Sequence, residues 1–352
     1  MSHDINRRTA LKGVAGAGLI AAGGLSLLTT ACSRDGKGQS EQKDLPVGVL
    51  SSEGNQVLTI EKLMSNKGYF KEVGLLPTIL QLSSGTNMIG SLLNGQADVC
   101  IFAGFSALIT AIEKGAELKI LGAASVKGQQ ALFSKNPGVQ HVKDLEGRSI
   151  GVGHIGAQLH HVTTALLMKK GVDISKVRFV NIGSSGDVFR AVATGVVDAG
   201  NGEADVLNVL DRYGVHMVQD GDYAIELPEY TWQASCASSK AILEKRETLV
   251  RTLAAHCKAF RYVQSPGSKD DFLQAQLDAL GQKNRDDVLA GANSQWEYLQ
   301  KRKPYAEDLA LSRERVQYMQ ELNIQISGQK SVVPYERLID ASLAQEAVSR
   351  LA

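Results

Sequence analysis

The sequence has 352 residues, a net charge of +1 and a hydrophobic content of 43%. The near balance of charges excludes a protein that holds nucleic acid on a basic surface, so we expect no nucleic-acid partner. About 300 residues follow an unusual N-terminal segment, which is more than one hydrophobic core commonly serves. We therefore expect two domains.

The N-terminal segment has the pattern of an export signal. Arg7-Arg8 precede an uncharged run, residues 13–31, that ends in small residues directly before Cys32. A basic start, an apolar middle and small residues at the end predict a signal peptide over residues 1–31. The arginine pair resembles a twin-arginine export signal, with Ala10 where phenylalanine is usual. Five glycines dilute the run, which argues against a membrane-spanning helix.

Cys32 stands where a bacterial lipoprotein carries its lipid. Such a signal usually has leucine three residues before the cysteine, whereas this chain has Thr29 there and Leu28 one residue earlier. We expect lipidation, with cleavage and an unmodified cysteine as the alternative. Residues 33–43 contain no large apolar side chain, so residues 32–44 are expected to form a flexible, lipidated tether. These features predict a protein on the periplasmic or cell-surface side of a bacterial membrane, attached by its lipid alone. We also expect a monomer.

The remaining cysteines and the paired histidines do not suggest a metal site. Cys100, Cys236 and Cys257 are widely spaced and odd in number, so no disulfide framework is implied. We interpret them as small buried apolar residues. His160 and His161 are neighbours on an expected helix, where successive side chains diverge by about 100°. We therefore expect no metal and no cofactor.

Two parts of the chain share one order of strands and helices. Gly95-x-x-Asp98 recurs as Gly195-x-x-Asp198, 100 residues later, and Ser84-Gly85 recurs as Ser185-Gly186, 101 residues later. This repeat predicts an α/β fold with two lobes, each a mostly parallel sheet with flanking helices. From residue 241 onward the pattern is helical, and we expect this C-terminal region to pack around the first lobe. The expected strands lie at residues 45–50, 76–82, 97–102, 149–152, 177–182 and 197–199.

The candidate site lies at the ends of the predicted strands. Ligands of α/β sheets bind beyond the carboxyl ends of the strands, where this chain has loops rich in glycine and hydroxyl residues without lysine or arginine. A negatively charged group would then be held by hydroxyls and by backbone N–H groups at helix starts. The candidate ligand-binding residues are Ser51, Ser52, Gly54, Ser84, Gly85, Thr86, Gly104, Phe105, Gly156, Ala157, Gln158, His160, Ser185, Glu203 and Trp232.

Several of these residues also have a purely structural interpretation. Serine before a helix commonly caps it, and this alternative stays open for Ser84 and for Ser184-Ser185. Glu203 is either a surface charge or a polar ligand contact. Trp232 and Tyr230 either stack on a ligand or fill the interface between the lobes.

A series of short motifs resembles the periplasmic solute-binding proteins for nitrate, sulfonates, taurine and thiamine-type pyrimidine precursors. The resemblance spans roughly residues 46–345. Ala157 and the segment 202–205 depart from the hydroxyl residue and the proline-containing loop that many relatives carry, and this leaves the substrate open. The motifs are Gly68-Tyr69-Phe70-Lys71-Glu72-Val73-Gly74-Leu75, Ser84-Gly85, Leu92-x-x-Gly95-x-x-Asp98, the segments 142–152 and 333–340, and Met319-x-x-Leu322.

The resemblance implies a two-lobed binding fold with two hinge crossings, near residues 123–133 and 230–235. Lobe 1 would comprise residues 45–124 plus 232–352, and lobe 2 residues 130–228. The implied function is delivery of a small organic anion, such as a sulfonate, nitrate or a carboxylate, to the permease of an ABC importer. The alternatives are a pyrimidine or thiamine-precursor binding protein or a related enzyme, and a sensory lipoprotein without a transport role.

The sequence favours a binding protein over an enzyme. It contains no Gly-x-Ser-x-Gly nucleophile elbow, no His-Glu-x-x-His zinc motif and no Walker loop. It also lacks the cysteine cluster of relatives that make the thiamine pyrimidine. We therefore expect no catalytic residues.

Overall fold

A computed structural model describes residues 44–51, 54–82, 85–281, 284–326 and 328–351. The predicted signal peptide, the lipidation site Cys32 and nearly all of the predicted tether lie outside the described residues, as do the candidate ligand contacts Ser52 and Ser84. The backbone of Thr86 is described, but its side chain is not.

The first sheet has five strands in the order β2 (Leu75–Gln81), β1 (Leu45–Ser51), β3 (Val99–Gly104), β10 (Gln233–Ser238) and β4 (Leu118–Ser125). The first three strands pair in parallel, and β10 pairs antiparallel with both of its neighbours. The strand β4 therefore runs in the same direction as β1 to β3, and only β10 is reversed.

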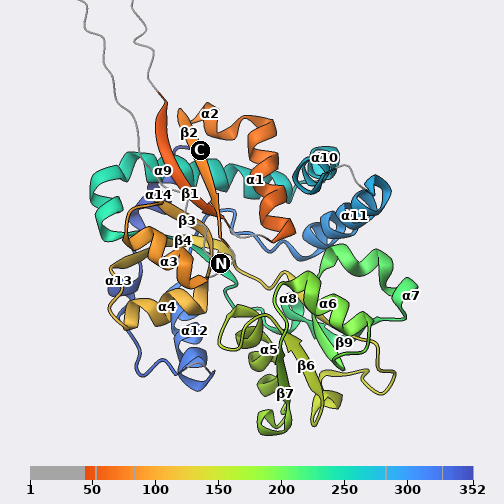
Figure 1. Ribbon diagram of the computed structural model, residues 1–352. Helices are drawn as coiled ribbons and strands as arrows, with labels where there is room; N and C mark the ends of the chain where they lie inside the picture. Colours follow the sequence, from red (N-terminus) through yellow and green to blue (C-terminus); the bar gives the residue numbers. More distant parts are fainter. Residues whose placement is uncertain (1–43, 52–53, 83–84, 282–283, 327, 352) are drawn as a thin grey trace, which may run out of the picture. The chain divides into compact units, whose positions relative to one another are not determined.

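The second sheet repeats this arrangement. Its order is β7 (Arg178–Asn181), β6 (Ser149–Val152), β8 (Ala199–Glu203), β5 (Gln130–Ser134) and β9 (His216–Asp222), and β5 is the reversed strand. The two sheets thus have equivalent topology, with the strand contributed by a crossing segment as the fourth in each. This confirms the predicted fold class of two mostly parallel sheets with flanking helices (Figure 1).

The repeated Gly-x-x-Asp motif has the same structural role in both sheets. Gly95 and Gly195 have φ values of 74° and 76°, in the left-handed region that glycine enters without strain. The Asp98 carboxylate accepts a 2.8 Å hydrogen bond from the backbone N–H of Gly48 in β1. The Asp198 carboxylate accepts a 2.9 Å bond from the N–H of Ser149 in β6. Each aspartate thus ties the start of the third strand to the first.

Helices flank both sheets and form the C-terminal region. Beside the first sheet lie α1 (Asn55–Lys67), α2 (Tyr69–Glu72), α3 (Gly85–Leu93) and α4 (Phe105–Glu113); beside the second lie α5 (Gln158–Lys169), α6 (Ser185–Ala193), α7 (Leu210–Tyr213) and α8 (Tyr223–Glu226). The C-terminal helices are α9 (Ser239–Val263), α10 (Lys269–Leu280), α11 (Arg285–Arg302), α12 (Arg313–Ile326), α13 (Tyr335–Leu338) and α14 (Ser342–Ser349). Short 3-10 turns occur at Val142–Leu145, Ile174–Lys176, Ala204–Val209 and Pro266–Ser268.

The C-terminal helices contact both halves of the molecule. Helices α9 and α14 pack on each other beside the first sheet, and α10 packs on α1. Helix α11 lies beside α10 and contacts the turn 204–209 that follows β8 (Figure 1). The expected packing around the first lobe is therefore present, and α11 extends it to the second sheet.

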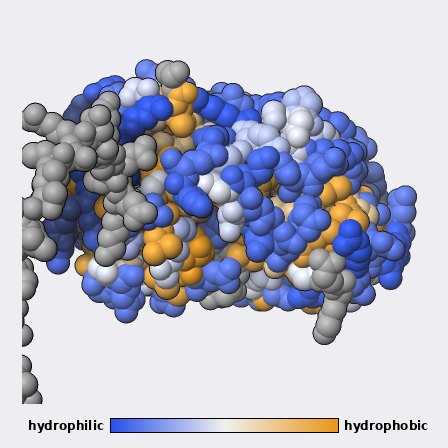
Figure 2. Space-filling model, turned by 90° about the horizontal axis from the view of Figure 1, so that it is seen from above, coloured by the Kyte–Doolittle hydropathy of each residue, from blue (hydrophilic) through white to orange (hydrophobic). Residues whose placement is uncertain are grey.

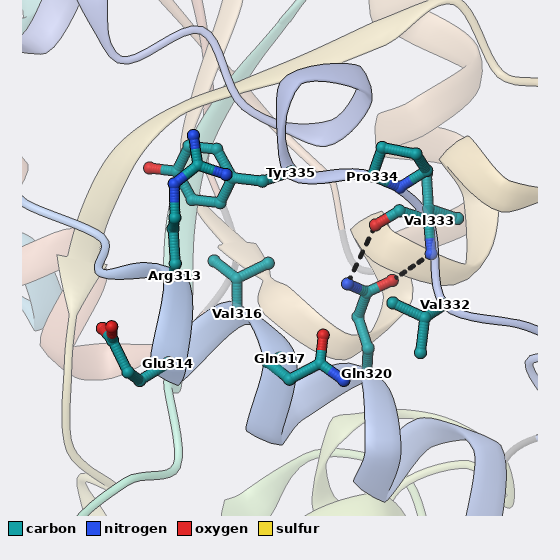
Figure 3. A pocket seen from close by; sticks show the side chains of 9 residues that line it. All are labelled: Arg313, Glu314, Val316, Gln317, Gln320, Val332, Val333, Pro334 and Tyr335. Carbon is teal, nitrogen blue, oxygen red and sulfur yellow. Dashed lines mark hydrogen bonds between the residues drawn. The ribbon is translucent and has the colours of Figure 1, made fainter.

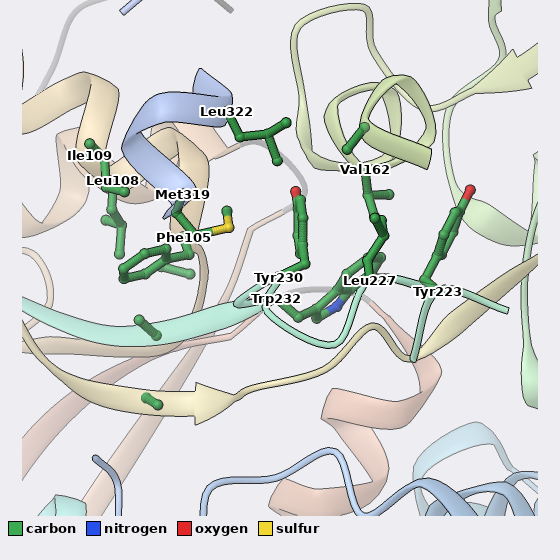
Figure 4. Packing of buried hydrophobic residues seen from close by; sticks show 14 of the residues in the cluster. Phe105, Leu108, Ile109, Val162, Tyr223, Leu227, Tyr230, Trp232, Met319 and Leu322 are labelled. Atoms are coloured by element: carbon green, nitrogen blue, oxygen red, sulfur yellow. The ribbon is translucent and has the colours of Figure 1, made fainter. Parts of the chain in front are cut away.

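Buried hydrophobic clusters cover both faces of the first sheet. In β3, Val99 and Ile101 join a buried cluster with α1, α9 and α10, whereas Cys100 between them joins another with α4 and α12. This alternation follows from the two-residue period of a strand. Part of the second cluster, which also reaches α5, appears in Figure 4.

The chain passes from the first sheet to the second between Ser125 and Gln130, and returns between Asp222 and Gln233. Figure 2 shows one face of the molecule, which is mainly hydrophilic with small, separate hydrophobic areas. Among the residues that the structure describes, none of the helices combines the length and hydrophobicity that a membrane crossing requires.

Candidate functional site

The start of α5 meets the end of β3, and this contact joins the two halves. Gln158 Nε2 donates a 2.6 Å hydrogen bond to the carbonyl oxygen of Trp232. A Cβ added at Gly104 would lie 3.2 Å from Gln158 Oε1, closer than an ordinary van der Waals contact. The structure thus brings Gly104, Gln158 and Trp232 together, and glycine at position 104 is what permits the approach of α5.

Glu203 makes a second junction between the halves, at the carboxyl end of β8. Its carboxylate accepts a 3.0 Å hydrogen bond from the Ser185 hydroxyl of α6 and another from the backbone N–H of Gln56 in α1. Oε2 of Glu203 has no hydrogen-bond partner among the described residues. Burial, and then the nearby Asp205 carboxylate, raise the pKa of Glu203. A carboxyl group of this kind gains proton affinity because water no longer stabilises its charge.

Asp205 contacts the same helix start. Its carboxylate accepts a 3.2 Å hydrogen bond from Asn55 Nδ2, and burial raises its pKa. Neither Glu203 nor Asp205 forms an ion pair with a basic side chain in the described part of the chain. Two carboxyl groups of the second half therefore sit at the N-terminus of α1, where the helix dipole favours negative charge.

The helix starts predicted to bind an anion differ in how they are capped. The N-cap positions of α1, α4 and α5 are Gly54, Gly104 and Ala157, and none provides a side-chain cap. Helix α6 is capped instead by Ser184, which accepts from the N–H of Asp187 at 3.2 Å. The capping interpretation of Ser184 is therefore confirmed, and three other helix starts are without such a cap.

A set of glutamines surrounds Glu203 near the crossings. Gln130 lies directly opposite Glu203 in the antiparallel pair β5–β8, so the two side chains share one face of the sheet. Gln130 is only 8% exposed, and its Oε1 has no partner within the described ranges. Gln56 Nε2 donates to the Tyr305 hydroxyl at 2.9 Å, and Gln129 also hydrogen-bonds that hydroxyl. Sequence reasoning missed these residues, because an isolated glutamine carries no recognisable pattern.

Ser51 at the end of β1 is engaged by a buried carboxyl group. The Ser51 hydroxyl donates a 2.8 Å hydrogen bond to Glu61 Oε2 of α1. Burial raises the pKa of Glu61 to about 7, and the bond from Ser51 partly opposes this rise. Glu61 Oε1 has no partner in the part of the chain that the structure describes. No sequence pattern indicates Glu61, which lies within a helix whose other buried residues are mostly apolar.

The adjacent histidines point to different surroundings, as their spacing predicts. The ring of His160 packs edge-on against Phe179, with centroids 4.5 Å apart, and burial lowers its pKa. His161 Nδ1 lies 2.8 Å from the Tyr230 hydroxyl, and burial lowers the pKa of His161 to about 4. Among the described residues, no group of three or more histidine, cysteine or acidic side chains is arranged to hold a metal ion.

The aromatic candidates lie in the core. Phe105 is fully buried near Leu108 and Met319, as Figure 4 shows. Trp232 is 4% exposed and stacks on Tyr223, with ring centroids 6.2 Å apart. We therefore assign a packing role to both side chains and retain their backbone atoms as candidate contacts. The N–H of Phe105 itself donates to the Trp232 carbonyl at 3.3 Å.

The remaining candidates are backbone positions at helix starts. Gly85 and Thr86 are the first two residues of α3, and Gly156 precedes the N-cap of α5 with a φ of 88°. No Cβ clash prevents substitution at Gly156, but the left-handed backbone favours glycine there.

A further pocket lies on the C-terminal region, between α12 and the segment 332–335 (Figure 3). Gln320 forms its inner wall and exchanges two hydrogen bonds with the backbone of Val333, at 3.1 and 2.7 Å. Arg313 lies over the ring of Tyr335 at its mouth, 4.4 Å from the centroid. None of the candidate ligand-binding residues lines this pocket.

Comparison with solved structures shows the same fold in periplasmic binding proteins. The aliphatic sulphonate binding protein SsuA from Escherichia coli is 16% identical, with a TM-score of 0.67 over 85% of this chain and 99% of that one. The nitrate-binding protein NrtA from Synechocystis PCC 6803 is 12% identical, with a TM-score of 0.67 over 88% and 89%. The desulfurization enzyme DSZB is 16% identical, with a TM-score of 0.59 over 88% and 100%. A comparison with curated protein sequences finds no match.

A family model places the sequence more specifically. The model described as NMT1/THI5 like matches residues 63–267, more than half of the chain. This range runs from the last residues of α1 to just beyond α9 and contains every described strand except β1. It includes Gln158 and Glu203 but begins after Gln56, and the chain belongs to the NMT1/THI5-like family.

Proposed function

We propose that this protein is an extracytoplasmic solute-binding protein that delivers a small organic molecule to the permease of an ABC importer. The proposal rests on one observation: strand ends and helix starts of both halves meet in one region. Glu203 of the second half, held by Ser185, meets the start of α1, and Gln158 meets Gly104. Binding between two lobes requires groups from both, and these residues provide them.

The first candidate ligand is a small organic anion, such as a sulfonate, nitrate or a carboxylate. The helix start at Ala157 has no side-chain cap, so its N–H groups are suited to an anion. The start of α1 already meets Glu203 and Asp205, and the Phe105 N–H at the start of α4 donates to the Trp232 carbonyl, so an anion would have to displace these contacts. The similarity of the fold to sulfonate- and nitrate-binding proteins supports this class.

The second candidate is a ligand rich in hydrogen-bond donors, such as an amino-pyrimidine of the thiamine-precursor type. A specific feature favours it: Glu61 Oε1, Glu203 Oε2 and Gln130 Oε1 are buried side-chain atoms without partners in the described residues, and all three are acceptors. A buried acceptor without a donor costs about 1–3 kcal/mol. A ligand that supplied amino groups to these oxygens would remove that cost.

We assign the protein a binding role without chemical turnover. The mature protein is proposed to be a monomer, held at the periplasmic or outer face of the membrane by a lipid on Cys32 after twin-arginine export. The domain boundaries 45–124 plus 232–352 and 130–228 are part of the same proposal, and the crossings at 125–130 and 222–233 support them. A permease gene and an ATPase gene beside this one would favour transport over a sensory role.

Calorimetric titration of the protein lacking residues 1–31 tests the proposal and separates the two ligand classes. The panel comprises nitrate, short alkanesulfonates, aromatic carboxylates and amino-pyrimidines, each at pH 6 and pH 8. Because rising pH increases the negative charge on Glu203, an anion should bind less tightly at pH 8 and a donor-rich ligand more tightly. Glu203→Gln should remove most of this pH dependence. Failure of every panel member to bind would contradict both candidates.

A further inference from the structure

Two cysteines that are 136 positions apart face each other in the first sheet. Cys100 of β3 and Cys236 of β10 are opposite residues of an antiparallel pair, beside a register shift between Ala234 and Cys236. Both side chains are fully buried, and both are free thiols in the structure. No sequence pattern connects them, since neither lies near another cysteine in the chain.

The two thiols also lie on the same face of the sheet. Cys100 and Cys236 belong to one buried cluster, whereas their neighbours Val99 and Ala237 belong to the cluster on the opposite face. Cys257 of α9 is also in that opposite cluster, and its Sγ donates to the carbonyl of Glu307 at 3.2 Å. Among the three described cysteines, Cys100 and Cys236 are therefore the natural pair.

We propose that Cys100 and Cys236 form an intrachain disulfide when the chain folds under oxidising conditions. Directly opposite residues of an antiparallel pair have Cα atoms about 4.5–5.5 Å apart. A disulfide needs Cα atoms about 4.4–6.8 Å apart, so the bond demands little movement of either strand.

The oxidant is a small or protein disulfide that exchanges with the thiols. One cysteine thiolate attacks a sulfur of the oxidant, releases one thiol and forms a mixed disulfide. The second cysteine then attacks the mixed disulfide and releases the other half of the oxidant as a thiol. Two electrons and two protons pass from the cysteines to the oxidant, and one new S–S bond joins β3 to β10.

The bond must form before the first sheet is complete. In the folded protein both thiols are inaccessible, and contact with Cys100 together with burial raises the pKa of Cys236 well above that of an ordinary thiol. The thiolate is the attacking species, so the folded, reduced protein should react very slowly. A chain that folds before twin-arginine export would therefore gain the bond only where an oxidant is present during folding, and this dependence on folding state distinguishes the pair from an exposed redox switch.

The bond would link β10, the strand with which the chain returns to the first sheet, to β3. Residues 100–236 include the whole of the second sheet, and β10 is the strand that follows the second crossing. A disulfide that closes so long a loop restricts the unfolded chain strongly. The midpoint of thermal unfolding should therefore be several degrees higher for the oxidised protein than for the reduced one. Both forms have the same sequence and the same folded contacts, so the difference measures the effect of the bond.

The test uses the full chain with the substitution Cys32→Ala, so that only the three described cysteines remain. The protein is unfolded in denaturant with a reductant, freed of reductant and refolded with glutathione disulfide; a second sample is refolded reduced and exposed to glutathione disulfide afterwards. Free thiols are then alkylated under denaturing conditions, and the peptides are mapped by mass spectrometry without reduction.

The first sample should contain a peptide linking Cys100 to Cys236, with Cys257 alkylated, and the second should contain three alkylated cysteines. A Cys257→Ser control should still form the link, whereas Cys236→Ala should abolish it. Three alkylated cysteines in the first sample, stable glutathione adducts, or a link to Cys257 would overturn the proposal. Equal midpoints of thermal unfolding for the oxidised and reduced forms would overturn the role of the bond in fastening β10.

Discussion

Glu61→Gln should make the stability of the protein less sensitive to pH. Burial raises the pKa of Glu61 from 4.5 to about 7, so the folded state holds this proton more tightly than the unfolded chain does. The stability that follows from this difference is fully present below pH 4.5 and is lost as the pH rises toward 7. A difference of this size corresponds to roughly 3 kcal/mol, at about 1.36 kcal/mol for each pKa unit.

Glutamine is neutral at every pH, and its side-chain oxygen can still accept the hydrogen bond from Ser51. The free energy of unfolding of the parent should therefore fall by about 3 kcal/mol more than that of the variant between pH 4.5 and pH 8. Urea unfolding at the two pH values measures this difference. Glu229→Gln changes an exposed glutamate and is the matched control, which should follow the parent. Identical pH dependence for Glu61→Gln and the parent would refute the assignment of a buried, protonatable carboxyl group.

Three further predictions follow from the contacts between the halves and from the N-terminal sequence. Gly104→Val should weaken ligand affinity at least tenfold, as measured by calorimetry, because even a Cβ at this position would lie 3.2 Å from Gln158 Oε1. Unchanged affinity would mean that the contact between Gly104 and Gln158 does not border the binding site. Compared with the parent, Glu203→Gln should gain more free energy of unfolding at pH 8 than at pH 5 in urea unfolding, because only the parent then buries a charged carboxylate. A variant less stable than the parent at pH 8 would show that the charge is stabilising there. Replacing Arg7-Arg8 by lysines should stop export, as measured by cell fractionation; normal export would contradict the twin-arginine assignment. Cys32→Ala should release the exported protein from the membrane; a variant that stays membrane-bound would contradict the lipid anchor.

The fold could be predicted from the sequence where the signals are local. The Gly-x-x-Asp repeat marks the start of the third strand in both sheets because glycine adopts a left-handed turn there and aspartate binds the neighbouring strand. Ser184 and Asp187 form a capping box, which requires only residues three apart. The strands β4, β5, β9 and β10 were not predicted, because residues 118–125, 130–134, 216–222 and 233–238 contain few of the β-branched residues that mark strands.

The candidate site was less predictable, because its contacts join distant parts of the chain. Glu203 was a candidate, but nothing local indicates that it meets the backbone of Gln56, nearly 150 residues earlier. Gln130 becomes its neighbour only through the antiparallel register of β5 and β8. Phe105 and Trp232 were expected beside the ligand because they follow or precede strand ends, yet their side chains complete the core between the halves.

The central claim is that a ligand binds between the two halves and draws them together. Small-angle X-ray scattering of the protein lacking residues 1–31, with and without a panel ligand shown by calorimetry to bind, measures this movement directly. Rotation about the two crossings predicts a smaller radius of gyration in the complex. An unchanged radius of gyration with a saturating ligand would contradict closure around a site between the two sheets.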